Sequence, residues 1–329
     1  MKRIIIVLMV LGLIACEEKE ERQLIKMVSS VEKQTKATVL DNVLLGGNGF
    51  GVMCYVKENG YFDEINDKPN YAYNLKVYKS GSSWVSSNDL YWPESSTDRV
   101  SFVAYAPYAT ADNGITPSSV SHSGYPILNY FANNTDITKQ VDLCYAPPML
   151  NKTQVNGVIN FGFKHSLTKI TFSAKSHYDY DTIVGYKIKS IKLTNIITKG
   201  ELLLGMTPTW TPSSSLSDTG SYFLTIGNQL KDLKLGLTYQ GINNEDAFLM
   251  LIPQTFDAIN TKLEIVIIDA LGTEIKTKQI KLSDIIIGNK FNLGQNLNIR
   301  LNVVAGDVYA SLNVVSWTTV GSGSSQIGK

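Results

Sequence analysis

The residues that could carry out chemistry are few and lie far apart along the chain. The three histidines, His122, His165 and His177, lack the spacing of a zinc site or of a nucleophile–histidine–acid triad. The sequence also contains no nucleophile elbow, phosphate loop, zinc-protease or calcium-loop motif. Paired carboxylates of the glycosidase type need no local motif, so the acidic residues leave that chemistry open. We predict no catalysis, no cofactor and no metal site, and we expect His165 to be structural.

The chain has three cysteines, of which Cys16 lies near the N-terminus and Cys54 and Cys144 lie in the body of the sequence. The last two could form one disulfide in an oxidising compartment, or they could be two buried thiols. Hydrophobic residues make up 43% of the chain, which is enough to build cores without a covalent crosslink. This composition favours buried thiols.

The first sixteen residues have the organisation of an export signal. Lys2 and Arg3 precede an unbroken apolar run at 4–15, which is shorter than the roughly 20 residues that a membrane-spanning helix needs. The sequence Leu-Ile-Ala-Cys at 13–16 resembles the bacterial lipobox. That resemblance implies cleavage before Cys16 and acylation of its thiol, so that several acyl chains hold the protein on a membrane. The alternative is an ordinary secretory signal with a cysteine near its cut site.

The residues after Cys16 change abruptly to charged side chains. Glu17, Glu18, Glu20 and Glu21 either form a solvated tether or act as an acidic tag, since they resemble the tags that carry lipoproteins to the outer face in Bacteroidota. We therefore expect a lipoprotein on the outer surface of the outer membrane, with membrane lipid as a partner. The formal net charge is +1 and the basic residues are dispersed, so we expect no nucleic-acid partner.

Beyond the N-terminal region the sequence predicts an all-β protein. Short stretches rich in β-branched and aromatic residues alternate with Gly, Pro, Ser, Asn and Asp, and the mature chain shows no sustained helical period. Such patterns are typical of antiparallel β-sandwiches. The predicted strands are 50–56, 72–78, 100–105, 140–145, 158–163, 167–174, 188–195, 223–226, 247–252, 262–269, 297–304 and 308–317.

The length of 329 residues favours two domains. We predict a signal peptide at 1–15, a polar tether or leading segment at 16–36, an N-terminal β-sandwich at 37–176 and a C-terminal β-sandwich with a tail strand at 177–329. A boundary about fifteen residues earlier, near His165, is the alternative.

Five segments resemble the fimbrillin-like family of Bacteroidota, which includes the type V pilins. The most recognisable segment is Val-Ser-Phe-Val-Ala-Tyr-Ala-Pro-Tyr at 100–108, which resembles the family pattern F-x-A-Y-x-P-Y. The others follow in the family's order and resemble a D-L-L-x-A strand, an F-x-H-x-L-x-K-I strand, an L-I-P-Q segment and the closing strand. They lie at 141–146, 158–170, 248–254 and 314–317.

The resemblance implies two β-sandwich domains that assemble by strand addition. In this family a trypsin-like protease removes a leading strand, and the tail strand of another subunit fills the groove that the cut opens. Lys36, followed by Ala37, stands where the best-known members have an arginine, so an arginine-specific protease would not cut here. The resemblance implies a structural or accessory subunit at the tip or anchor of a fimbria, with other fimbrial subunits as partners and the fimbrium as its location after processing.

The candidate donor strand is the last apolar segment of the chain. Val308, Ala310, Leu312 and Val314 are apolar at period two, and the register shifts by one before Trp317, as at a bulge. The alternative is an ordinary edge strand of its own domain.

A second function class is a lipid-anchored protein that binds a glycan or another host ligand. Six aromatic residues crowd one region and could stack on sugar rings, although aromatic residues in a β protein usually fill cores. They are Tyr71, Tyr73, Tyr78, Trp84, Tyr91 and Trp92. In addition, Thr182 lies in an Asp-Thr-Ile sequence that fits the O-glycosylation pattern of this bacterial group.

Overall fold

The computed structural model describes residues 22–31, 45, 47–176, 185–225, 237–242 and 248–315. Within this part the elements with defined bounds are strands and short 3₁₀ turns, so the predicted all-β class is confirmed. The turns are η1 (Ile137–Lys139), η2 (Gln154–Asn156), η3 (Leu216–Asp218) and η4 (Leu282–Asp284). Among the described residues, no helix has the length and apolar character needed to cross a bilayer.

The N-terminal half is built on a sheet of seven strands. The outermost strand β1 runs parallel to β9, and all the other neighbours are antiparallel. In spatial order the strands are β1 (Met27–Val31), β9 (Ile159–His165), β8 (Cys144–Lys152), β5 (Arg99–Ala106), β2 (Phe50–Lys57), β3 (Ala72–Ser80) and β4 (Ser83–Ser86).

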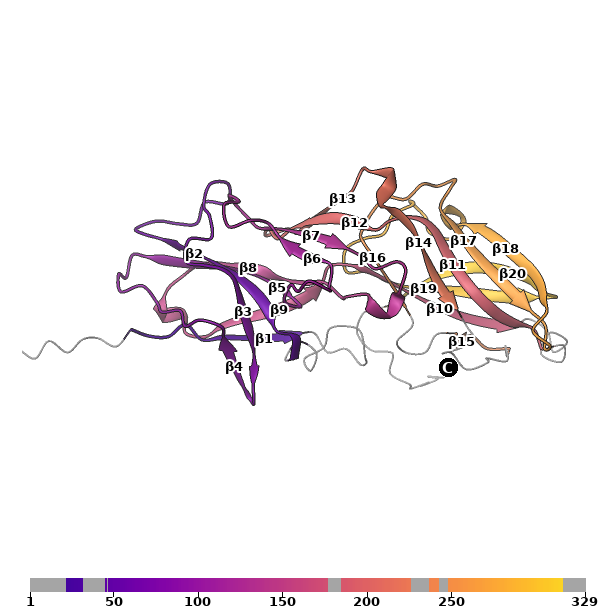
Figure 1. Cartoon of the computed structure of the whole chain (residues 1–329), viewed down its shortest axis with the longest axis horizontal. Helices are drawn as coiled ribbons and strands as arrows, with labels where there is room; N and C mark the ends of the chain where they lie inside the picture. The colour runs from indigo at the N-terminus through magenta and orange to yellow at the C-terminus, as the bar shows by residue number, and fades with distance from the viewer. Residues whose placement is uncertain are drawn as a thin grey trace, which may run out of the picture.

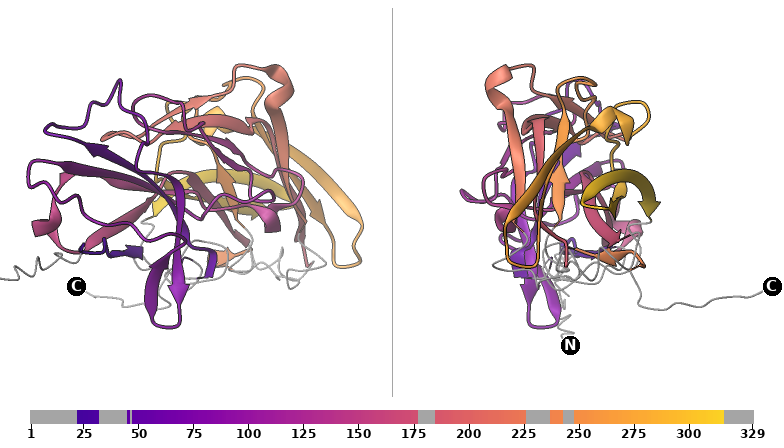
Figure 2. Two further views of the ribbon diagram at one scale, coloured as in Figure 1. Left: turned by 60° about the vertical axis from the view of Figure 1, so that its left-hand side comes forward. Right: turned by 90° about the vertical axis from the view of Figure 1, so that its right-hand side faces the viewer.

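The centre of this sheet is covered on both faces. Every residue of β5 after Arg99 is buried, which explains why its sequence is apolar almost throughout instead of alternating. One face carries Phe50 and Phe102 in a cluster with Phe161. Tyr105, on the opposite face, belongs to the core that continues into the rest of the molecule. The hairpin of β3 and β4 projects beyond the body (Figures 1 and 2).

A four-stranded sheet joins the two halves of the chain. Its central pair, β7 and β12, brings Leu128 opposite Leu202 through antiparallel hydrogen bonding. It lies between the seven-stranded sheet and the C-terminal strands (Figure 1). In spatial order its strands are β13 (Thr209–Pro212), β12 (Lys199–Leu203), β7 (Ile127–Phe131) and β6 (Ile115–Pro117).

The C-terminal half consists of two further sheets whose inner faces share one core. Ile170 and Ile299 from the first sheet are buried in the same cluster as Ile191 and Ile265 from the second. The first sheet contains β15 (Gln240–Gly241), β10 (Thr168–Ser176), β19 (Asn296–Val304) and β20 (Asp307–Val315), with β16 (Leu249–Leu251) also paired to β10. The second contains β14 (Thr219–Thr225), β11 (Lys187–Ile197), β17 (Lys262–Ile268) and β18 (Glu274–Lys281).

Several features differ from the sequence-based expectation. The strand predicted at 140–145 begins only at Cys144, because Gln140 caps η1 and its side chain bonds to the backbone of Met250. The region predicted to be a polar tether contains β1. Sheet membership changes between β9, which ends at His165, and β10, which lies in a C-terminal sheet. The boundary predicted at 176/177 follows β10, so the domain division stays a prediction.

Candidate functional site

The leading segment at 23–31 closes the N-terminal half of the molecule. On one side β1 pairs with β9, with Met27 opposite Ile159. On the other side the backbone amide of Ile25 donates to the carbonyl of Leu90 at 2.8 Å, and the amide of Trp92 donates to the carbonyl of Gln23 at 2.9 Å. The segment therefore lies between β9 and the chain at 90–92 and satisfies backbone groups of both.

The segment also covers the aromatic core of this half. Ile25 is 2% exposed and Met27 is 5% exposed, and both belong to the cluster that contains Trp92, Phe102 and Phe161. These two residues lie at alternate positions, as expected for a strand with one face on a core. Without the segment, the β9 edge and this part of the core would face solvent.

Ser29 lowers the stability with which the leading strand is held. It occupies the next alternate position after Ile25 and Met27, yet its Oγ atom is buried and has no hydrogen-bond partner among the described residues. A buried hydroxyl without a partner costs about 1–3 kcal/mol. Outside the strand, Arg22 Nε bonds to Glu94 Oε1 at 2.7 Å, but both side chains are largely exposed. Such pairs add little stability.

The candidate donor strand β20 lies at an edge of its own sheet. It pairs with β19, with Leu312 opposite Ile299. Val308 is buried, Ala310 and Leu312 are half-buried, and Val314 is 64% exposed. The predicted alternation therefore holds over the first part of the strand, and β20 has the arrangement of an ordinary edge strand in this structure.

Two lysines of the neighbouring sheet hold the start of β20. The Asp307 carboxylate lies 3.2 Å from Lys276 Nζ and 3.1 Å from Lys278 Nζ, both on β18. Burial tends to raise the pKa of Asp307, but a hydrogen bond from the Val308 amide and the two ammonium groups outweigh it and lower the pKa. The ionised carboxylate is thus part of the contact between β18 and β20.

A buried cluster of titratable groups lies where β8 begins and β9 ends. His165 Nδ1 is 2.8 Å from Asp142 Oδ2 and 3.6 Å from Cys144 Sγ. The ligand-type atoms of these residues lie within 4.8 Å of one another, so their types and spacing could hold a metal ion. All three are buried, and burial raises the pKa of the Cys144 thiol, with the nearby Asp142 adding to the rise. A buried protonated thiol is a poor nucleophile.

Sequence reasoning missed this cluster because His165 is more than twenty residues from Asp142 and Cys144. Cys144 and His165 are register partners on β8 and β9, so a correct strand pairing would have found it. The second cysteine, Cys54, is also buried and free, and burial raises the pKa of its thiol. The structure thus has two buried thiols, as the composition indicates.

Three of the six aromatic residues considered for sugar stacking, Tyr71, Trp84 and Trp92, pack in the N-terminal core. Trp92 is 3% exposed and packs against Phe102 with ring centroids 6.2 Å apart. Trp84 packs edge-on against Phe50 at 5.4 Å. The Tyr71 hydroxyl donates to the backbone carbonyl of Tyr91. Tyr73, Tyr78 and Tyr91 are exposed, so the structure divides the six aromatic residues between the core and the surface.

Six candidate residues lie outside the part of the chain that the structure describes. They are Cys16, Lys36, Ala37, His177, Thr182 and Trp317. His122 is described, and its Nε2 lies 3.0 Å from the carbonyl oxygen of Tyr125. The described part therefore assembles no site from the three histidines.

Comparisons with known proteins agree with the architecture. The model of the fimbrillin-like family matches residues 35–320. Fimbrium subunit Fim1C of Phocaeicola vulgatus is 26% identical over 189 residues, which are 51% of this chain and 50% of that protein. The alignment thus spans about half the length of that curated relative.

Solved structures share the fold. A fimbrial protein from Bacteroides vulgatus superposes with a TM-score of 0.68 at 20% identity, covering 90% of this chain and 100% of that chain. A candidate cell adhesion protein from Bacteroides uniformis gives a TM-score of 0.58 at 16% identity, covering 90% and 99% of the two chains. With a family model that matches most of its length, this chain belongs to the fimbrillin-like family.

Proposed function

We propose that this chain is a non-catalytic structural or accessory subunit of an adhesive fimbria, and that it assembles by strand exchange after trypsin-like cleavage at Lys36. The observation that carries the proposal is the leading segment, which covers an aromatic core yet precedes the candidate cleavage point. Its last strand residue, Val31, comes five positions before Lys36. Cleavage there would separate the whole strand from the rest of the chain.

The energetic argument compares the two strands that could occupy the same groove. Removing β1 would leave unpaired N–H and C=O groups on β9 and expose Phe161. An added strand would pair with the backbone groups of β9 and would also cover Phe161. The leading strand places the unpartnered hydroxyl of Ser29 toward this core. The tail strand instead offers apolar side chains at each alternate position, namely Val308, Ala310, Leu312 and Val314, so replacement would favour the tail strand.

The anchor and the location form the second part of the proposal. Acylation of Cys16 would place the uncut chain on the outer membrane, where more than one acyl chain gives stable attachment. Cleavage at Lys36 would release the body from that anchor, so a cut subunit would belong to the fimbrium. A subunit that keeps its leader would remain at the membrane, as an accessory or anchor.

The first experiment follows cleavage and assembly of the purified mature chain. Mild trypsin should yield a product that begins at Ala37, and this product should form ladders on gels under mild denaturation. Lys33 also follows β1 and offers trypsin a second cut, so a variant with both Lys33→Ala and Lys36→Ala should abolish both results, whereas Arg22→Ala, which changes a basic residue before β1, should leave them intact. A product that starts at Ala37 but stays monomeric under all conditions would contradict assembly by strand exchange.

A deletion tests the groove independently of any protease. A chain produced without residues 16–36 should melt at a lower temperature than the complete mature chain, because the aromatic core loses its cover. A synthetic peptide with the sequence of residues 307–317 should restore the melting temperature. A peptide in which Val308, Ala310 and Leu312 are each replaced by Asp is the matched control and should not restore it.

A separate experiment tests the anchor. Cys16→Ser should move the protein from the membrane fraction to the soluble fraction of cells.

A further inference from the structure

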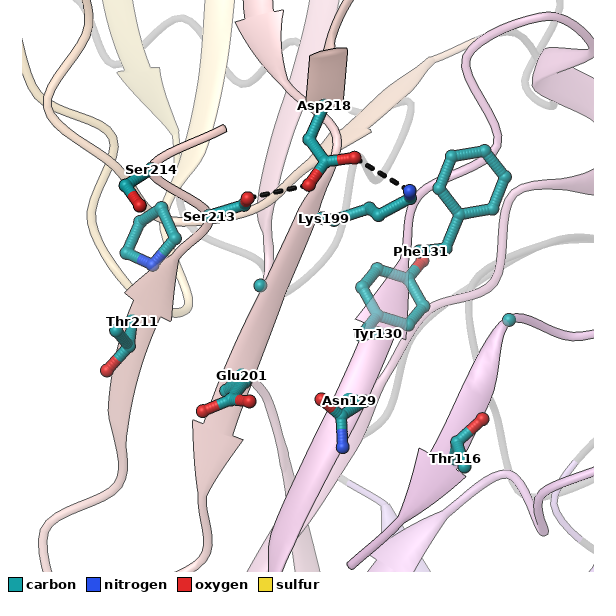
Figure 3. A pocket seen from close by; sticks show the side chains of 13 residues that line it. Thr116, Asn129, Tyr130, Phe131, Lys199, Glu201, Thr211, Ser213, Ser214 and Asp218 are labelled. Atoms are coloured by element: carbon teal, nitrogen blue, oxygen red, sulfur yellow. Dashed lines mark hydrogen bonds and ion pairs between the residues drawn. The ribbon is translucent and has the colours of Figure 1, made fainter. Parts of the chain in front are cut away.

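The sheet that joins the two halves carries an open hollow of about 470 Å³ on its outer face. Its floor is a row of four polar side chains, one from each strand. The pairing register places Thr116 beside Asn129, Asn129 beside Glu201, and Glu201 beside Thr211. Figure 3 shows this row running across β6, β7, β12 and β13. The volume lies in the range of roughly 300–1,000 Å³ that is typical of small-molecule sites.

The four side chains are exposed and keep their hydrogen-bonding capacity for a ligand. None of them bonds to another protein group among the described residues, although they stand on neighbouring strands. Together they offer two hydroxyls, one carboxamide and one carboxylate. Directly opposed residues on paired strands have Cβ atoms about 4.5–5.5 Å apart, so the groups of Asn129 and Glu201 can engage one ligand molecule.

A wall of the hollow lies beside the row, at the Lys199 end of β12, and hydrogen bonds and an ion pair support it. Lys199 Nζ lies 2.7 Å from Asp218 Oδ1, and the Ser213 hydroxyl donates to Asp218 Oδ2 at 2.6 Å. The dashed lines in Figure 3 mark both contacts. The Asp218 side chain is only 15% exposed. The wall is therefore held in place before a ligand arrives, and its lysine is already neutralised.

An aromatic ring stands beside this wall. Phe131 pairs across the sheet with Lys199, and its side chain is 41% exposed. It projects on the same side of the sheet as Asn129, two positions earlier on β7. The hollow thus combines one apolar ring with a row of free polar groups.

We propose that this hollow binds one or two rings of an uncharged glycan. Vicinal sugar hydroxyls both donate and accept, which suits the Asn129 carboxamide, the Glu201 carboxylate and the two threonine hydroxyls. The apolar face of a sugar ring can pack on Phe131. Glu201 is the one charged lining residue without an ion pair among those described. It disfavours sialylated and sulfated glycans by repulsion.

The test uses the mature chain on an array that carries neutral, sialylated and sulfated oligosaccharides. We expect binding to neutral hexose or N-acetylhexosamine oligosaccharides, and titration calorimetry with the strongest neutral oligosaccharide then gives its Kd. Asn129→Ala and Glu201→Ala should each weaken that binding about tenfold or more, since each removes a directly bonded polar group. Glu58→Gln changes an exposed carboxylate far along the chain and should leave the Kd unchanged.

Melting curves must show that the variants remain folded, which we expect because all three positions are exposed. The proposal is overturned if no glycan binds, if anionic glycans bind best, or if both pocket variants bind as the unchanged chain does. It is also overturned if those variants lose filament assembly while no glycan binds, because the hollow is then a contact between subunits. Glycan binding by a chain that never assembles would contradict the proposed strand exchange but would support the proposed glycan site.

Discussion

The imidazole Nδ1 of His165 lies 2.8 Å from Oδ2 of Asp142, and both side chains are buried. The pair connects the chain before β8 to the end of β9, at the place where the structure passes from the seven-stranded sheet to β10. Lys169 follows on β10, where burial lowers the pKa of its ammonium and the charge of Asp142 opposes that shift. Two of the family-like segments thus meet in one buried polar cluster.

Replacing Asp142 by alanine should destabilise the fold strongly. The change would remove the buried carboxylate that lies 2.8 Å from His165 Nδ1, and breaking a buried pair from one side typically costs about 3–5 kcal/mol. Urea unfolding at neutral pH measures the loss. Glu94→Gln removes one member of an exposed ion pair and serves as the control, with an unchanged midpoint expected. If both variants unfold at the same urea concentration as the original chain, the cluster does not hold this junction together.

Replacing Ser29 by valine should stabilise the uncut chain. The substitution removes a buried hydroxyl that has no partner among the described residues and adds apolar contact with the aromatic core. We expect a gain of about 1–3 kcal/mol in the free energy of unfolding. The same variant should keep its leading strand bound for longer after trypsin cleavage, which size-exclusion chromatography can follow. Ser80→Val, at an exposed strand position, is the matched control. Equal release from both variants would show that the Ser29 hydroxyl does not weaken the strand.

Replacing Asp307 by asparagine should change how stability depends on pH. The folded pKa of Asp307 is lowered below that of the unfolded chain, which is about 4. Its contribution is therefore present above that value and disappears as the pH falls through the folded pKa. The variant should melt at a lower temperature than the original chain at pH near 7, and the difference should shrink as the pH falls below the unfolded pKa and through the folded pKa.

Asp112→Asn provides the comparison for this experiment, because Asp112 is exposed and no ion pair involves it in the described structure. A difference between the Asp307 variant and the original chain that stays constant across the pH range would rule out the ionised contact with Lys276 and Lys278 as its cause.

Replacing Gln254 by alanine should loosen the connection between β11 and the chain after β16. Its side-chain oxygen accepts from the Ile197 amide at 2.9 Å, and its Nε2 donates to the carbonyls of Ile197 at 2.9 Å and Ile252 at 3.0 Å. The side chain is 3% exposed. We expect a loss of about 1–3 kcal/mol on urea unfolding, because buried backbone groups would lose their partners. Gln279→Ala, in an exposed strand, should have no measurable effect. A similar loss in both variants would count against a special role of Gln254.

Strands that are apolar along most of their length could be predicted from the sequence, whereas several strands with many polar, exposed positions could not. The runs that became β2 and β5 are apolar because the sheet is covered on both sides there. By contrast, β18 has the sequence Glu-Ile-Lys-Thr-Lys-Gln-Ile-Lys and is mostly exposed, so its pattern resembles a loop. β7 and β12 were missed because they are short and place Asn129 and Glu201 toward solvent. The polar hollow lies on those strands, so the sequence offered no signal for it.

The sequence by itself determined the all-β class, the apolar strands and the family resemblance, because these depend on residue type and on the spacing of near neighbours. Only the tertiary structure decided that residues 23–31 close the aromatic core, that Asp142 meets His165, and that Asn129 meets Glu201. Each of these arrangements depends on which strands pair. Strand pairing joins residues far apart in the chain, and it is selected by the burial that the complete fold achieves.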